Sequence, residues 1–265
     1  MNKELRNYIL SLAEKKLRNN KRALNEFRPV SVETGVSKNA EGSAMVRIGN
    51  SVAIAGVKMD IGKPFSDTPN KGNLMCGAEL SPISDSDFEP GPPGENAIEL
   101  SRVIDRGIRE SGAIDLEKLC IVKGKQVWNI FIDIYIFNND GNLIDTCGLA
   151  AIAALKSAKI PKLEKKKGEK EYRVVLGEWS KEKMPIKELP IPITFAKIGN
   201  NLIADPDKDE EEVSDARITI TCTDKNVNAM QKGGAGAFNP KEIESCVEES
   251  FKIREKLTEL IKTIK

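Results

Sequence analysis

The sequence predicts an α+β fold built from two related halves, each a series of short strands followed by a helix. Short apolar and β-branched runs separated by glycine and proline occupy residues 30–80 and recur in residues 191–231, which is typical of strands and turns. Each series is followed by a stretch with apolar spacings of three and four, at residues 95–110 and 239–261, which predicts a helix. No residue-level repeat relates the two halves.

The first half is expected to open with an amphipathic helix near residues 5–17. Strands are predicted at residues 30–33, 44–48, 52–59 and 74–80 before the central helix, and at 118–122 and 127–137 after it. The composition of residues 138–142 predicts a turn. Residues 146–157 are nearly all Ala, Leu, Ile and Gly, so we expect a helix that is buried on most sides and closely approached by other backbone.

A charged segment of low complexity, residues 162–173, predicts an exposed loop or hairpin between the halves. Strands are then expected at residues 191–198, 202–204, 216–222 and 227–231, followed by a helix that opens with Asn239 as its cap and Pro240 at its first position. The predicted organisation is an N-terminal helix and basic arm (1–26), a first half (27–158), a charged connecting segment (159–187) and a second half with a C-terminal helix (188–265).

Charge and composition limit the possible functions. The 265 residues include 41 basic and 40 acidic side chains, a net charge of +1, so any attraction to nucleic acid must come from local patches. The chain has no histidine, which excludes Ser-His-Asp and Cys-His nucleophile systems and most transition-metal sites.

Five cysteines without C-x-x-C spacing indicate small buried thiols in a reducing compartment, with neither a disulfide framework nor a zinc site. The amino terminus lacks an apolar signal core, and no segment approaches eighteen apolar residues. These features predict a cytoplasmic protein that does not bind membranes.

The segment 88–109 is the most informative stretch of the chain. A Pro/Gly-rich lead-in precedes a helix whose apolar stripe is Ala97, Leu100, Ile104 and Ile108, and whose charged stripe is Glu95, Glu99, Arg102, Arg106 and Arg109. Three guanidiniums within two turns are suited to binding successive phosphates of a nucleic acid. The alternative is a solvated face held by the pairs Asp105–Arg109 and Arg106–Glu110. Taken alone, the segment favours this alternative.

Three other segments carry weaker patterns. Six carboxylates fall within residues 205–212; they suit a metal or general-acid site, but without EF-hand spacing they favour a solvated acidic turn. The glycine-rich residues 231–236 could cradle a phosphate, but they lack the P-loop pattern and favour a mobile loop. Basic side chains that could extend a nucleic-acid path, each more typical of plain surface, are Lys63, Lys71, Arg18, Lys21 and Arg22.

Several segments together resemble the RNase PH family across nearly the whole chain, and so imply an RNase PH-like fold. They are residues 26–29 (EFRP), 42–44 (GSA), 67–74 (DTPNKGNL), 88–109, 140–145 (DGNLID) and 204–207 (ADPD). The stretch EPGPPGENAIEL at residues 89–100 is similar to one branch of the family, the non-catalytic RNase PH-like subunit of the archaeal exosome.

Active family members are phosphorolytic 3′→5′ exoribonucleases, and the chain departs from both of their catalytic motifs. Where they read Gly-Gly-Thr-Arg after the Asp-Gly pair, this chain has Asn142, Leu143 and Ile144, so a phosphate would lose its charge-assisted hydrogen bonds. Where they place an acidic residue after the acidic turn, this chain has Arg217, with Glu211 in place of an earlier Asp. Because arginine stays protonated, it neither donates a proton nor binds a cation.

The resemblance therefore implies a subunit that is not catalytic on its own and holds RNA through Arg102 and Arg106, with Arg109, Lys63 and Lys71 as secondary contacts. It implies pairing with a catalytic RNase PH-like subunit, three such pairs in a hexameric ring, and cap subunits carrying S1 with KH or zinc-ribbon domains. It implies no metal and no cofactor; inorganic phosphate is used at the partner's site. The family's amino-terminal Arg-x-Asp-Gly-Arg element is reduced here to residues 18–22 (RNNKR).

Two alternatives stay open at this point. The chain could be an autonomous phosphorolytic 3′→5′ exoribonuclease that uses Asp205, Asp207 and Glu211. It could also be a purely architectural subunit in which the arginine stripe only pairs with Glu95 and Glu99.

Overall fold

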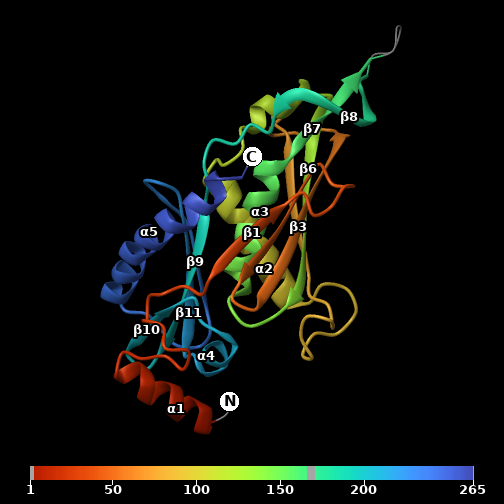
Figure 1. The fold of residues 1–265 in the computed structure, drawn as a ribbon. Coiled ribbons are helices and arrows are strands. Elements are labelled where there is room, and N and C mark those ends of the chain that lie inside the picture. Colours follow the sequence, from red (N-terminus) through yellow and green to blue (C-terminus); the bar gives the residue numbers. More distant parts are fainter. Residues whose placement is uncertain (1–2, 166–170, 265) are drawn as a thin grey trace.

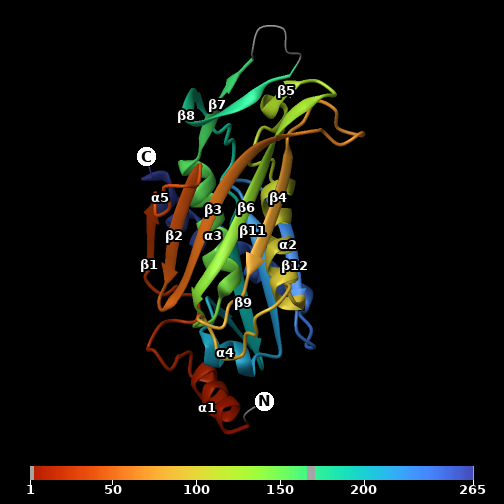
Figure 2. The same cartoon turned by 90° about the vertical axis from the view of Figure 1, so that its right-hand side faces the viewer.

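The computed structural model describes residues 3–165 and 171–264. Figures 1 and 2 show a layered α+β molecule in which two helices lie between a larger and a smaller sheet and a third helix covers the outer face of the smaller sheet. This arrangement confirms the predicted fold class. The layering follows from the sequence pattern, because both sheets and the long helices each carry an apolar face that must be buried.

The larger sheet has six strands in the order β1-β2-β3-β6-β4, with β5 paired to β6. All neighbours are antiparallel except β4 and β6. Alternation along β6 buries Ile130, Ile132, Ile134 and Ile136, as a strand with one covered face requires. The predicted strand at 118–122 is shorter, because residues 116–119 form a 3-10 turn. The bounds are β1 Val30–Thr34, β2 Gly42–Ile48, β3 Ser51–Gly62, β4 Asn73–Glu79, β5 Cys120–Val122 and β6 Gln126–Asn138.

The smaller sheet is antiparallel, in the order β10-β9-β11-β12. Helix α5 (Pro240–Lys262) packs on β9 and β11, and its predicted cap is confirmed: Asn239 and Glu242 form a reciprocal capping box. Helices α1 (Lys3–Glu14) and α4 (Lys208–Val213) share a small second core at one end of this sheet. The strands are β9 Ile191–Ile198, β10 Asn201–Ala204, β11 Ala216–Cys222 and β12 Val227–Gly233.

Helix α3 (Leu143–Ser157) is the centre of the molecule and contacts strands of both sheets. It begins before the predicted residue 146, and Ile144 to Leu155 are all buried. Two glycines allow close packing. A Cβ on Gly148 would lie 2.4 Å from Cγ of Pro192, and one on Gly42 would lie 2.3 Å from the carbonyl oxygen of Ala154. The expected close approach of backbone to this helix is therefore confirmed.

The charged connecting segment contains a β-hairpin. Strands β7 (Lys159–Glu164) and β8 (Arg173–Lys183) pair antiparallel, so the hairpin interpretation of residues 162–173 is confirmed for the strands that flank its middle. Residues 166–170 lie outside the described residues.

All five cysteines are free thiols. Cys147, Cys222 and Cys246 are buried, whereas Cys76 and Cys120 are only partly buried. Burial raises the pKa of the Cys222 and Cys246 thiols to about 12, so these groups stay protonated at neutral pH and pack as small apolar side chains.

Candidate functional site

Helix α2 (Glu95–Glu110) separates its two faces as the spacing predicts. Ala97, Leu100, Ile104 and Ile108 are at most 5% exposed, while Arg102 and Arg106 are exposed to solvent. Within residues 3–165 and 171–264, neither guanidinium has a hydrogen-bond or ion-pair partner. Both cations are therefore free to bind an external anion.

The expected pairing along α2 is half right. Arg109 forms the predicted ion pair with Asp105 at 2.8 Å, and it also donates to the carbonyl oxygen of Leu74 at 3.0 Å. The predicted pair between Arg106 and Glu110 does not form in the described part of the chain. Arg109 is thus held by its own fold, unlike the two arginines before it.

Glu99, which the architectural alternative pairs with the arginine stripe, has a different partner. Its carboxylate forms a short ion pair with Arg217 of β11 and accepts from Nε2 of Gln231 on β12 at 3.4 Å. Glu99 is therefore paired with the smaller sheet and not with Arg102 or Arg106.

The five positions predicted to be degenerate lie together. Asn142, Leu143, Ile144, Glu211 and Arg217 all line one cleft of about 190 Å³, which Glu99 and Thr194 also line. We call this the vestigial cleft. The structure thus brings together positions as far apart in sequence as the turn before α3 and strand β11.

The vestigial cleft contains an internal anion. Asn142, in the left-handed backbone region (φ 54°), is the N-cap of α3, and its N–H donates to Oε1 of Glu211 at 2.9 Å. A helix N-terminus attracts anions, and here the carboxylate of the chain itself takes that place. Burial raises the pKa of Glu211, although the Asn142 N–H and Arg217 oppose the shift. Leu143 and Ile144 add no donor side chains.

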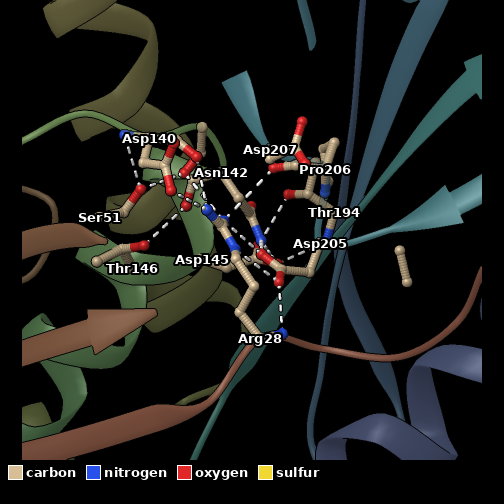
Figure 3. A network of polar contacts seen from close by, with 12 residues as sticks. Arg28, Ser51, Asp140, Asn142, Asp145, Thr146, Thr194, Asp205, Pro206 and Asp207 are labelled. Carbon is tan, nitrogen blue, oxygen red and sulfur yellow. Dashed lines mark hydrogen bonds and ion pairs between the residues drawn. The ribbon is translucent and has the colours of Figure 1, made fainter. Parts of the chain in front are cut away.

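The acidic segment is not a solvated turn, so that interpretation is wrong for half of its carboxylates. Asp205 is fully buried and accepts from Arg28 and Asn142 at 2.7–2.9 Å (Figure 3). It also accepts from Arg22 at 2.8 Å. Asp207 is the N-cap of helix α4, a helix that was not predicted from the sequence. Among the described residues no three carboxylates or thiols gather as metal ligands.

In the amino-terminal basic cluster, Arg18 and Arg22 are buried and are not available to a nucleic acid, whereas Lys21 is exposed. Arg18 is 4% exposed and forms a bidentate ion pair with Glu210, while Arg22 is 9% exposed and pairs with Asp205 at 2.8 Å. Arg28 joins the network from the start of β1 and reaches the carbonyl oxygens of Asp140 and Gly141. These arginines fasten the amino-terminal arm to the second half.

The remaining candidates occupy separate places. Lys63 follows β3 and is exposed, and Asn73 of β4 donates to its carbonyl oxygen at 2.9 Å. Lys71 lies in the turn before β4 and is partly buried. The glycine-rich residues 231–236 complete β12 and then form a loop whose Gly236 N–H donates to the carbonyl oxygen of Asp215 at 2.7 Å. The loop prediction is therefore wrong for residues 231–233, which are strand, and right for the residues that follow them.

Asp145 is a buried acid that the sequence analysis quoted but did not single out. It is 0% exposed in α3 and accepts from Asn142 Nδ2, the Thr194 N–H and Thr194 Oγ1 (Figure 3). Thr194 Oγ1 in turn lies 2.8 Å from Oγ1 of Thr219. The detectable signal was one carboxylate inside an otherwise apolar helix, a position that is rarely tolerated without partners.

Burial raises the pKa of Asp145 to about 7, against the hydrogen bonds from Asn142 and Thr194 that favour the ionised form. Between about pH 4 and pH 7 the unfolded chain ionises this group while the folded chain keeps its proton. Wild-type protein therefore loses about 1.4 kcal/mol of stability per pH unit through this group as the pH rises. Above pH 7 both states are ionised and the loss stops growing.

The Asp145→Asn variant does not titrate at this position. We therefore expect its free energy of unfolding, relative to that of the wild type, to rise by roughly 4 kcal/mol between pH 4 and pH 7. The asparagine amide can donate to Thr194 Oγ1 as a protonated carboxyl would. Urea unfolding of both proteins at half-unit pH intervals measures the difference. If the free energies of unfolding of the two proteins change in parallel from pH 4 to pH 7, the raised pKa of Asp145 is contradicted.

The family can now be assigned from the whole chain. Residues 26–161 match the model of domain 1 of the 3′ exoribonuclease family (RNase PH), and residues 188–253 match the model of its domain 2. The chain therefore belongs to the RNase PH family, which confirms the resemblance inferred from the motifs.

Three known proteins place it more closely. The chain is 46% identical over 260 residues to the exosome complex component Rrp42 of Pyrococcus furiosus, covering 97% of this chain and 92% of that protein. It is similar to a chain in the structure of the Archaeoglobus fulgidus exosome with RNA bound to the active site (TM-score 0.86, 41% identity, 97% of both chains). It is also similar to a chain of an archaeal exosome core (TM-score 0.85, 40% identity, 98% and 97%).

Every helix among the described residues is too short or too polar to span a bilayer.

Proposed function

We propose that this chain is the non-catalytic, Rrp42-type subunit of an archaeal exosome, a phosphorolytic 3′→5′ exoribonuclease complex, and that it positions RNA at the active site of a catalytic RNase PH-like partner. One observation carries the proposal. Arg102 and Arg106 are exposed and unpaired within the described residues, on the helix whose Glu99 lines the vestigial cleft. The side chains proposed to bind RNA are thus available to a ligand, whereas Glu211 and Arg217 in the cleft are used in contacts within the chain.

The chain's own cleft does not support phosphorolysis. Attack by inorganic phosphate requires donors that hold the anion and a group that protonates the leaving oxygen. Here the α3 N-terminus already holds Glu211, and Arg217 is committed to Glu99. Asp205, which the autonomous-enzyme alternative needs, is buried against Arg22 and Arg28.

Arg102 and Arg106 are proposed to contact phosphates, because contacts to the backbone hold any RNA sequence. Arg109, Lys63 and Lys71 are proposed as secondary contacts. Arg109 is restrained by Asp105 and Leu74, so its contribution is expected to be smaller.

The proposed assembly follows the relatives, whose names describe exosome components and an exosome core. In it, this chain alternates with the catalytic subunit in a hexameric ring of three pairs, beneath cap subunits with S1 and KH or zinc-ribbon domains. Single-stranded RNA is the ligand, inorganic phosphate acts at the partner's site, and a cytoplasmic location suits five free thiols.

The proposal predicts that the purified chain degrades single-stranded RNA in phosphate at least about 100-fold more slowly than the pair with its catalytic partner does, because Glu211 and Glu99 occupy the donors that would otherwise hold the anion. Release of nucleoside diphosphates from a labelled RNA measures the rate. The partner alone and the pair without phosphate are the controls. Phosphate-dependent decay by the single chain would refute the non-catalytic assignment.

A further inference from the structure

A second groove borders the arginine stripe. It lies between α2 and the edge strand β12 and has a volume of about 370 Å³, with Val103 of α2 and Thr219, Thr221 and Ala229 of the sheet among its lining residues. Arg102 and Arg106 also line it. This size falls in the range of sites that bind small organic ligands. We call it the α2–β12 groove.

Its shape follows from small side chains. Thr221 pairs with Ala229 and Thr219 with Gln231 across β11 and β12, so these four share the sheet face that is turned to α2. At one end Gly107 allows the helix to approach the sheet, because a Cβ there would lie 2.9 Å from Cγ2 of Thr221. Beyond that contact, Ala229 leaves the space between helix and edge strand unfilled.

The charged side chains of the groove all come from α2, and its interior is uncharged. Its two guanidiniums are unpaired within the described residues. Of its two carboxylates, Glu99 is neutralised by Arg217, and Glu95 is exposed to solvent in the first turn of α2. Val103 is 7% exposed, and Thr219 and Thr221 are at most 3% exposed, so the interior is uncharged. Gln231 supplies both a donor and an acceptor at the wall. A ligand that fits has an anionic part at the arginines and a flat neutral part with polar edges inside.

We propose that the α2–β12 groove holds one nucleobase of the single-stranded RNA whose phosphates lie on Arg102 and Arg106. The inference rests on the proposed function and deepens it: the stripe holds the backbone, and the groove turns one base out of the strand. Unstacked bases in protein complexes are held in this way, by apolar or guanidinium surfaces on their faces and by hydrogen bonds at their edges. Charge complementarity favours RNA over a protein segment here, because phosphates are the ligands that two adjacent free guanidiniums bind best.

The test uses the assembled complex with the catalytic partner, in buffer without phosphate so that RNA is bound and not degraded. A set of oligoribonucleotides, each with one abasic residue, is titrated against the wild type. The abasic residue that empties the groove is expected to weaken binding about tenfold. An Ala229→Trp variant fills the groove, and with it that abasic RNA and the intact RNA should bind equally. Ala229→Leu serves if the larger side chain prevents folding.

The matched control is Leu176→Trp, which adds the same side chain at an exposed position of β8 outside the groove; it should keep the tenfold difference. If no abasic position is sensitive to Ala229→Trp, the inference is wrong, while weak binding by an Arg102→Glu/Arg106→Glu complex would still support the proposed function. If that charge-reversed complex binds normally, the proposed function itself fails. If Ala229→Trp prevents assembly with the partner, the groove is a protein interface and the inference is overturned.

Discussion

Reversing the charge of the two unpaired arginines of α2, Arg102→Glu with Arg106→Glu, is expected to lower the affinity of the assembled complex for single-stranded RNA by at least about 100-fold. Each hydrogen bond from a guanidinium to phosphate contributes about 1.5–3 kcal/mol, and 1.4 kcal/mol corresponds to a factor of ten. Because neither side chain is used within the described fold, stability should change little. Fluorescence anisotropy without phosphate measures binding, and decay with phosphate measures function.

Salt dependence separates phosphate contacts from other effects. Replacing both arginines with alanine should make the slope of log K against log salt shallower by about 1.4, since each single-strand phosphate contact contributes about 0.7. The matched control for the charge-reversed variant is Arg47→Glu with Lys256→Glu, which changes the net charge by the same amount at exposed positions on β2 and α5. Unchanged assembly, binding and decay in the charge-reversed complex would show that the stripe has only a structural role.

The largest effect on stability is expected from Asp205→Asn. This carboxylate is 0% exposed and pairs with Arg22 and Arg28, which are themselves at most 9% exposed. Removing one partner of a buried ion pair leaves an uncompensated charge and costs about 3–5 kcal/mol. For a chain of this size the melting temperature should fall by roughly 10 °C.

Asparagine is the appropriate replacement because Asp205 has φ 47°, a left-handed conformation that Asn also tolerates. The lost stability then reports the charge and not backbone strain. Glu212→Gln, an exposed carboxylate in α4 of the same segment, is the matched control and should change stability by less than about 0.5 kcal/mol. Equal effects of the two variants would contradict the role assigned to the buried network.

Much of the fold is predictable because its signals are local. The apolar spacing of α2, the Asn239–Pro240 helix start and the alternation along β6 each describe one element that buries one face. Local signals were insufficient where a helix is short or a strand is polar. Helix α4 was missed because five of its six residues, KDEEEV, are charged and give no apolar spacing. The charged segment predicted only a loop or hairpin, without the bounds of β7 and β8.

The motifs also located the five degenerate positions, since their departures from the family pattern are visible in the residues themselves. What they do in the folded chain was not visible. The replacement of an acidic residue by Arg217 predicted a loss of chemistry, but not the ion pair with Glu99. Glu211 was seen as a substitute acid, but not as the carboxyl group that accepts from the N–H of Asn142 at the start of α3.

The sequence alone therefore determined the fold class, the family and the arginine stripe, because periodicity, capping and motif spacing are properties of neighbouring residues. Only the tertiary structure decided which charged groups are used up inside the fold and which remain for a ligand. Arg18 and Arg22 were candidates for weak RNA contacts on the surface, yet both are buried against carboxylates that lie more than 170 positions away in sequence. A charge is neutralised by its neighbours in space, and burial makes that pairing obligatory.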